Sequence, residues 1–312
     1  MKRFFDIQNA FSKTFLIPVI LLFLIAPSLF SLDLEITGGF GNLAFDKDRT
    51  STLSAEEKEF SPQTFPLALV RFSGEQAAFA YNVGYEYDSI LRNRLFGNFI
   101  VDLEYLSIEA GPFVSIFNTR QMPFNPGISA GLGLQIPGIF FVRAAGSSTL
   151  AFVNDEKTGY NSQNTGSLSA GFWVPYVICS LNLNVRNFAK REEEHFLIED
   201  GLERWFFRAD IFTKNVPFTI RLDFGYQSLE RSYTSRFIKY DAIVTKTETD
   251  EFKSIFVGVE GRFNVNERLK IILGAEMPVY SWGERPMKDP PGDSLFFQAK
   301  AGMVLTFPAR IN

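Results

Sequence analysis

The sequence contains one cysteine, Cys179, and one histidine, His195. A single cysteine excludes an internal disulfide, and these two residues provide no cysteine–histidine metal cluster. Cys179 also lies far from the N-terminus, which excludes its use as a lipid-anchoring cysteine there. We therefore expect no disulfide framework, no metal and no cofactor.

An excess of basic residues is also missing. The chain has 31 Lys and Arg against 35 Asp and Glu, for a net charge of -4, and an isoelectric point near 5.3. This balance gives no support to nucleic-acid binding. Beyond the N-terminal region no segment is long and apolar enough for a transmembrane helix. The mean hydropathy of +0.02 is far too low for a helical membrane protein.

Aromatic residues, by contrast, are abundant. They make up 15% of the 312 residues, and phenylalanine alone accounts for 35. This content is high for a soluble protein and typical of a membrane β-barrel, which has aromatic girdles at both interfaces.

The N-terminus has the organisation of a secretory signal peptide. Lys2, Arg3 and Lys13 form a basic region, residues 15–25 are apolar, and residues 26–31 include small side chains. This order predicts a signal peptide over residues 1–31, cleaved near Ser31. The alternative is an uncleaved membrane anchor, for which the apolar region is short. Residues 32–312 would then form the mature domain.

Apolar and polar residues alternate with a period of two through most of residues 32–312. Phe79, Tyr81 and Val83, for example, alternate with small or polar residues. Successive side chains of a strand point to opposite faces, so the pattern predicts strands with one apolar face. About 14 strands are predicted, over residues 32–45, 63–73, 77–88, 94–106, 107–118, 126–136, 139–152, 166–177, 178–190, 203–213, 217–230, 250–264, 268–281 and 294–307. The turns at 105–107 and 175–178 are weakly marked, which leaves 12 strands as the alternative.

Short connections alternate with long polar ones. Pro137–Gly138 is a short connection, whereas the long ones are 46–62, 154–165, 192–203, 232–250 and 283–293. Short periplasmic turns and long extracellular loops are typical of outer-membrane barrels. A soluble β-sandwich, the competing interpretation, has no reason to segregate its loops in this way.

The last predicted strand ends close to the C-terminus and contains Gly302, Leu305 and the aromatic Phe307. This stretch resembles the C-terminal assembly signal of bacterial outer-membrane β-barrels, which the barrel-assembly machinery recognises. Residues 32–312 look like that superfamily throughout, and their phenylalanine-rich character is similar to small porin-like proteins of spirochaetes. The resemblance implies an all-β, transmembrane, antiparallel up-and-down barrel in the cell outer membrane, surrounded by outer-membrane lipid.

Closure of such a barrel follows from the bilayer, because hydrocarbon provides no partners for an unpaired strand edge. The first strand must therefore pair with the last. We expect Phe307 to face lipid and Lys300 to face inward, close to Asp33 or Glu35 across the closing seam.

The polar faces of the strands predict a charged lumen. Its lining would include Asp33, Glu35, Glu86, Asp102, Glu104, Glu109, Arg143, Arg186, Arg208, Asp210, Arg221, Asp223, Glu260, Arg262, Lys270, Glu276 and Lys300. Acids dominate in the early strands, which predicts one acidic wall. About 14 strands leave room for a water-filled pore, unless paired charges such as Arg221 and Asp223 form ladders that fill the interior.

Three other patterns have simpler explanations than a chemical site. His195, in the acidic stretch 191–200, is the one candidate base of an outer-membrane hydrolase, and we interpret it as an exposed loop residue. Residues 46–57 match part of a calcium-binding loop, but Ser51 occupies the glycine position. Gly131 and Gly133 begin a dinucleotide fingerprint that lacks its third glycine, so we interpret them as strand glycines.

The sequence thus predicts a passive channel for small hydrophilic solutes, with no enzymatic activity and no nucleic-acid partner. The alternative is a structural or adhesin-like barrel whose loops bind a partner. The chain resembles the long-chain fatty-acid transporters in barrel size only, because its first strand follows the signal at once and leaves no room for their N-terminal hatch.

Overall fold

The computed structural model describes residues 31–41, 65–116, 124–150, 161–193, 196–212, 217–239, 242–284 and 297–308. The predicted signal peptide, apart from Ser31, lies outside these residues, as do His195 and the calcium-loop match at 46–57. None of the described residues belongs to an apolar helix of the length needed to cross a membrane.

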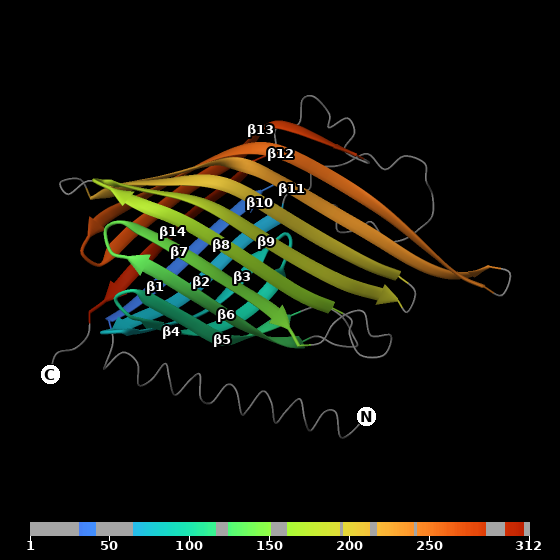
Figure 1. Cartoon of the computed structure of the whole chain (residues 1–312), viewed down its shortest axis with the longest axis horizontal. Coiled ribbons are helices and arrows are strands. Elements are labelled where there is room, and N and C mark those ends of the chain that lie inside the picture. The colour runs from blue at the N-terminus through green and yellow to red at the C-terminus, as the bar shows by residue number, and fades with distance from the viewer. Residues whose placement is uncertain are drawn as a thin grey trace, which may run out of the picture.

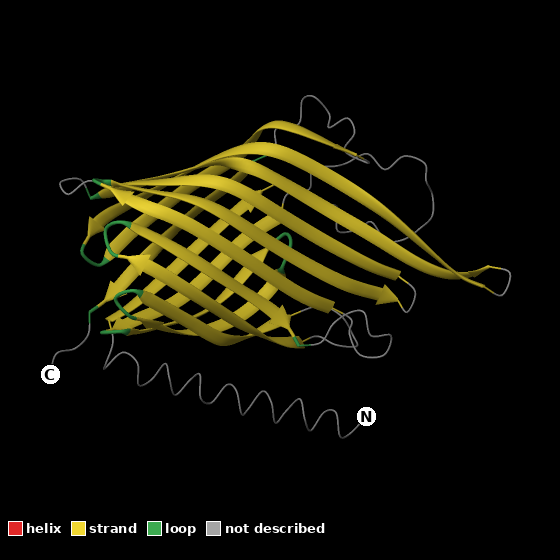
Figure 2. Cartoon of the chain, in the orientation of Figure 1, coloured by secondary structure: helices red, strands yellow, loops and turns green. Residues whose placement is uncertain are grey.

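The described residues form one closed antiparallel barrel in which every strand pairs with its sequence neighbours (Figures 1 and 2). Its strands are β1 (Ser31–Gly41), β2 (Phe65–Gln76), β3 (Phe79–Asp88), β4 (Arg92–Asp102), β5 (Leu106–Ile116), β6 (Phe124–Ile136), β7 (Phe140–Thr149), β8 (Asn161–Val174), β9 (Val177–Glu193), β10 (Phe196–Phe212), β11 (Phe218–Lys239), β12 (Ala242–Asn266), β13 (Leu269–Glu284) and β14 (Gln298–Phe307). Both weakly marked turns exist, at 103–105 and 175–176. The prediction of 14 strands is therefore confirmed, and the alternative of 12 is wrong.

The first strand pairs with the last, as the closure argument requires. Leu32 lies opposite Phe307 along the seam between β1 and β14. The predicted neighbours of Lys300 are wrong, however, because this register places Lys300 opposite Gly39. Glu35 lies opposite Val304 instead, closer to the end of the seam where Leu32 pairs with Phe307.

The direction of each side chain follows from one contact that crosses the barrel. Arg186 on β9 donates a hydrogen bond to Asp88 on β3, and these two strands are not neighbours in either direction. Both side chains must therefore point into the interior. Residues directly opposite each other in paired strands share a face, so the register extends this assignment to every strand.

The other face points outward and is apolar. Exposed large apolar side chains come from β1 and from β3 through β14, and include Leu181 (67% exposed) and Phe224 (57%). Soluble monomers rarely expose so extensive an apolar surface. A bilayer accommodates it, and the closed barrel leaves no unpaired edge within the hydrocarbon. We therefore treat this face as the lipid-facing surface.

An aromatic row borders this surface toward the longer strand ends. Trp205 lies opposite Tyr226, and the rings of Tyr226 and Trp282 are 6.0 Å apart. Beyond the row the outward positions become polar, with Glu203 on β10 and Ser228 on β11. Tryptophan and tyrosine prefer the membrane–water interface, so the row marks the border of the hydrocarbon.

The strands β9–β12 continue past the aromatic row as a polar extension, which we define as residues 187–193, 196–203, 228–239 and 242–253 (Figure 1). Two segments predicted to be loops are therefore mostly strand, namely 192–203 and 232–250. The predicted loop 154–165 also ends in strand, because residues 161–165 begin β8. Apolar alternation fails here because the outward face meets no lipid. Hydroxyl pairs occupy it instead, such as Thr234 and Thr247 at 3.2 Å.

The short turns 77–78, 103–105, 137–139, 175–176 and 267–268 all lie at the opposite end, with Ser31 and Phe307. The predicted set of short turns at one end is thus present. The turns 77–78 and 267–268 begin two or three residues later than the predicted strands imply, and the turns 103–105 and 175–176 begin earlier.

Leu181→Arg tests the lipid-facing assignment. Leu181 points outward between the turn at 175–176 and Leu183, which lies opposite Trp205. A cation near the bilayer midplane costs about 2–4 kcal/mol, so the unfolding free energy in lipid vesicles should fall by that amount. Thr247→Arg, an exposed outward position of the extension, should cost little. Equal costs in a urea titration of the two variants would contradict the assignment.

Candidate functional site

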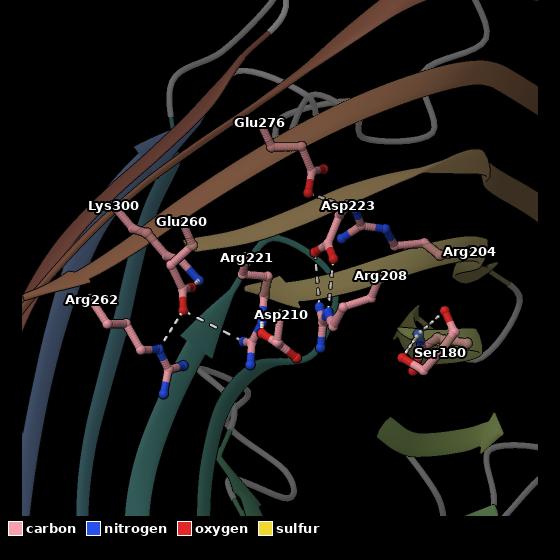
Figure 3. Close-up of polar contacts among 11 residues, drawn as sticks. Ser180, Arg204, Arg208, Asp210, Arg221, Asp223, Glu260, Arg262, Glu276 and Lys300 are labelled. Carbon is pink, nitrogen blue, oxygen red and sulfur yellow. Dashed lines mark hydrogen bonds and ion pairs between the residues drawn. The ribbon is translucent and has the colours of Figure 1, made fainter. Parts of the chain in front are cut away.

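A row of ion pairs lines the interior face of β10 and β11 (Figure 3). Arg208 donates two hydrogen bonds of 2.8 Å to the carboxylate of Asp223, which lies opposite it in the register. Arg221 donates one hydrogen bond of 2.8 Å to Asp210, also directly opposite. The register of a single strand pair thus brings these four predicted residues together.

Glu260 on β12 is the centre of the charged interior (Figure 3). Its carboxylate oxygens lie 2.7 Å from Arg262 Nε, 3.5 Å from Arg221 Nη1 and 2.5 Å from Lys300 Nζ. Glu260 and Lys300 both lie opposite Gly274 on the intervening strand. A Cβ at Gly274 would come within 2.9 Å of Lys300 Cε, so the glycine provides the path that lets Lys300 reach Glu260.

The wall formed by β10–β14 presents more positive than negative charge to the interior. Its ion-paired cations are Arg204, Arg208, Arg221, Arg262 and Lys300, and their partners are Asp210, Asp223, Glu260 and Glu276. Five cations against four anions leave a net charge of +1. The side chains of Arg262 and Lys300 are 42% and 38% exposed, whereas that of Glu260 is 8% exposed. The accessible part of this wall is therefore cationic.

On the wall formed by β1–β4, two of the predicted acids have basic partners. Arg71 on β2 pairs with Glu35, and Arg94 on β4 lies 3.3 Å from Glu86. Arg71 and Arg94 point inward, opposite the acids that they bind. Asp33 and Asp102 also point inward on this wall, so the predicted excess of acids is reduced rather than removed. The alternation within one strand does not show which residues lie opposite it, so these basic partners were not predicted.

A cavity of about 220 Å³ lies between the two walls. Glu35 and Glu86 line it from β1 and β3, and Arg262 and Lys300 line it from β12 and β14. Arg186 on β9 closes a third side. The cavity is therefore bordered by charges of both signs from strands on opposite sides of the barrel.

Other predicted lumen residues stand apart from this network. Asp33, Asp102, Arg143 and Lys270 occupy inward positions, and none forms an ion pair with another described residue. Glu104 lies in the turn 103–105 rather than on a strand, so the prediction that it alternates with its strand neighbours is wrong.

The interior of β5–β8 is mostly small and uncharged. The hydroxyl groups of Ser147 and Thr165 lie 2.6 Å apart, and Ser129 donates to the carbonyl of Gly111. A Cβ at Gly131 would lie 2.6 Å from Glu109 Cγ, so this glycine allows close packing, as expected for a strand glycine.

Where the extension begins, the β3–β4 connection reaches across the barrel. Ile90 and Leu91 are 4% and 2% exposed and form one apolar cluster with Phe188, Leu229 and Phe252. These partners come from β9, β11 and β12, which are separated from β3 and β4 by at least four strands in either direction. We call residues 88–92 with these contacts the mouth bridge, because they connect opposite sides of the barrel mouth.

Hydrogen bonds fix the mouth bridge on both sides. Asp88 Oδ1 accepts hydrogen bonds from the amides of Ile90 (2.8 Å) and Leu91 (2.6 Å), while its Oδ2 accepts one from Arg186. Gln163, buried on β8, donates to the carbonyl of Leu91. One carboxylate thus shapes the turn and binds the opposite wall.

A buried ion pair lies next to the mouth bridge. Asp200 and Arg231 are 2% and 4% exposed, and Arg231 donates two hydrogen bonds to the Asp200 carboxylate. Burial opposes the charge of Arg231, but the Asp200 carboxylate holds the pKa of that guanidinium above its ordinary value. Arg92, with a left-handed φ of 62°, approaches the same carboxylate at 3.7 Å.

Sequence reasoning missed Asp88, Asp200 and Arg231 as site residues. Asp88 shares its period-two face with Glu86, so a signal for its direction was present. Asp200 and Arg231 fall in or beside segments predicted as loops, where no face was assigned. Among the described residues, no three His, Cys, Asp or Glu side chains are grouped closely enough to hold a metal ion.

Comparison with known proteins identifies no sequence relatives. No protein-family model and no curated protein matches the chain. Among solved structures, a bacterial polysaccharide outer membrane secretin aligns at 9% identity and a TM-score of 0.47, covering 89% of this chain and 98% of that one. The Ralstonia pickettii toluene transporter TbuX aligns at 10% identity and a TM-score of 0.34, covering 89% of each chain.

These similarities are too low to assign a family or a solute, so the architecture rests on the strand pairing itself. The barrel has 14 strands, an apolar outer face bordered by an aromatic row, and a polar, charged interior. Each of these features is general in outer-membrane barrels. The fold is therefore a closed, 14-stranded β-barrel with the architecture of outer-membrane barrels.

Proposed function

We propose that this protein is a channel in the cell outer membrane for the passive passage of small hydrophilic solutes. Residues 1–31 would export the chain, and the barrel-assembly machinery would insert it. The observation that supports the channel best is the cavity between Glu35, Glu86, Arg262 and Lys300, inside a barrel with an apolar exterior. A passive channel requires no catalytic residue, and we propose no enzymatic activity.

The charges of the cavity suit polar solutes and disfavour apolar ones. An apolar solute would have to displace water from charged groups without replacing its hydrogen bonds. An anion would meet the accessible guanidinium of Arg262 and the accessible amine of Lys300, because Glu260 beneath them is buried. We therefore propose a preference for anions over cations of the same size.

Lys300→Gln tests both the channel and its selectivity. The wild-type protein should give discrete current steps in a planar bilayer, with a reversal potential that favours chloride over potassium. Loss of one charge at about 4–8 Å in water changes an ion's energy by about 0.5–1 kcal/mol, so the chloride preference should fall about two- to fivefold. Lys253→Gln, on the outward face of β12, is the matched control and should leave selectivity unchanged. A correctly folded but silent wild-type barrel would refute the channel.

The outer surface of the extension favours a second candidate, a barrel that binds a partner. A concavity of about 480 Å³ lies on this surface, lined by polar side chains that include Glu199, Glu203 and Glu230. A silent barrel would leave this adhesin-like role as the better explanation of the long strands.

A further inference from the structure

The mouth bridge spans the barrel mouth, which a solute would have to cross. Ile90 and Leu91 lie in a short connection between neighbouring strands, yet their side chains contact the far side of the barrel. Tight connections of this kind usually turn back at the rim, and they need no partners there. Both residues are nearly fully buried, so the contact excludes water from this part of the mouth.

We infer that the mouth bridge is a closing element, which opens when the β3–β4 connection moves away from β9, β11 and β12. This inference rests on the proposed channel, because it assigns a closed state to that conduit. Asp88 is the positioning residue. It accepts hydrogen bonds from the backbone amides of Ile90 and Leu91, and these bonds hold the two apolar side chains against the opposite wall.

Opening breaks the hydrogen bond that Gln163 donates to the Leu91 carbonyl, but most other partners stay together on each side. Asp200 remains paired with Arg231 after Arg92 leaves, because Arg92 is the more distant of the two cations at 3.7 Å. Asp88 keeps the two amide bonds that shape the turn. Arg186, 43% exposed while paired, gains water in place of Asp88.

The opposite wall is also complete without the connection. Phe188, Leu229 and Phe252 belong to one cluster, and Leu202 packs against it. Opening therefore separates two formed surfaces rather than unfolding either one.

Cysteine labelling measures the opening directly. In a Cys179→Ser background, Leu91→Cys should react slowly with a membrane-impermeant maleimide, and the exposed control Thr247→Cys should react fast. Adding Arg186→Gln removes the ion pair to Asp88 and should speed labelling at position 91 about fivefold, which corresponds to about 1 kcal/mol. The same addition should not change labelling at position 247. Once labelled at position 91, single channels should show fewer and shorter closures.

The outcomes separate the closing element from the channel. Fast labelling at position 91 without Arg186→Gln, or conducting channels that the adduct does not alter, would overturn the closing element and leave the channel intact. Absence of current from every variant, labelled or not, would overturn the channel and the closing role with it, even if the labelling rates are as expected.

Discussion

Asp200→Asn is expected to release the extension while the barrel within the membrane stays folded. The Asp200 carboxylate accepts both hydrogen bonds that Arg231 donates to it, and both side chains are nearly fully buried. Asparagine keeps the shape but removes the charge, so the buried Arg231 loses the carboxylate that accepts two of its hydrogen bonds. Breaking a buried pair in this way typically costs about 3–5 kcal/mol, which favours local unfolding more than a hundredfold.

Limited proteolysis under native conditions measures this local unfolding. New cleavage between residues 228 and 253 should appear in Asp200→Asn at protease concentrations that leave the wild type intact. Glu203→Gln is the matched control. Glu203 points outward on the same strand and accepts a hydrogen bond from the exposed Trp205. An Asp200→Asn protein cleaved no faster than the Glu203→Gln protein would show that the buried pair contributes little to the extension.

Where lipid meets the chain, the strands could be predicted from the sequence. Leu181 and Leu183 on β9 alternate with polar residues because one face meets hydrocarbon and the other meets the interior. In the extension the outward face meets water rather than hydrocarbon, so Ser232 and Thr234 on that face gave no apolar alternation to detect. The errors of strand length at 192–203 and 232–250 share this cause.

The candidate site was predicted where a single strand pair determines it, as for Arg208 with Asp223. Contacts that depend on the register of the seam were not predicted correctly. Lys300 reaches Glu260 rather than Asp33 or Glu35. The bond between Arg186 and Asp88, 98 residues apart, depends on how the two sides of the barrel approach each other. Alternation along a strand contains no information on that approach.

Gly302→Val is expected to prevent the barrel from closing. Gly302 lies opposite Thr37 in the seam, and a Cβ there would lie 2.6 Å from the carbonyl oxygen of Ile36 and 2.4 Å from Thr37 Oγ1. The hydroxyl can rotate away, but the backbone oxygen can move only if β1 and β14 separate. Overpacking together with lost ladder bonds should cost on the order of 3–5 kcal/mol at the pair that closes the barrel. Refolding into detergent micelles, followed by heat-modifiable migration on a gel, measures the closed fraction.

Gly38→Val is the control within the same seam. Gly38 lies opposite Ala301, and a Cβ there would meet no atom within 4 Å, so this variant should close normally. Phe307→Ala separates the seam from the predicted assembly signal, because Phe307 is 48% exposed on the outer face. If Phe307 acts as a signal, its variant should refold in micelles and fail only in cells, whereas Gly302→Val should fail in both. A Gly302→Val protein that closes in micelles would show that β1 and β14 tolerate separation, and Gly302 would then be important only for recognition.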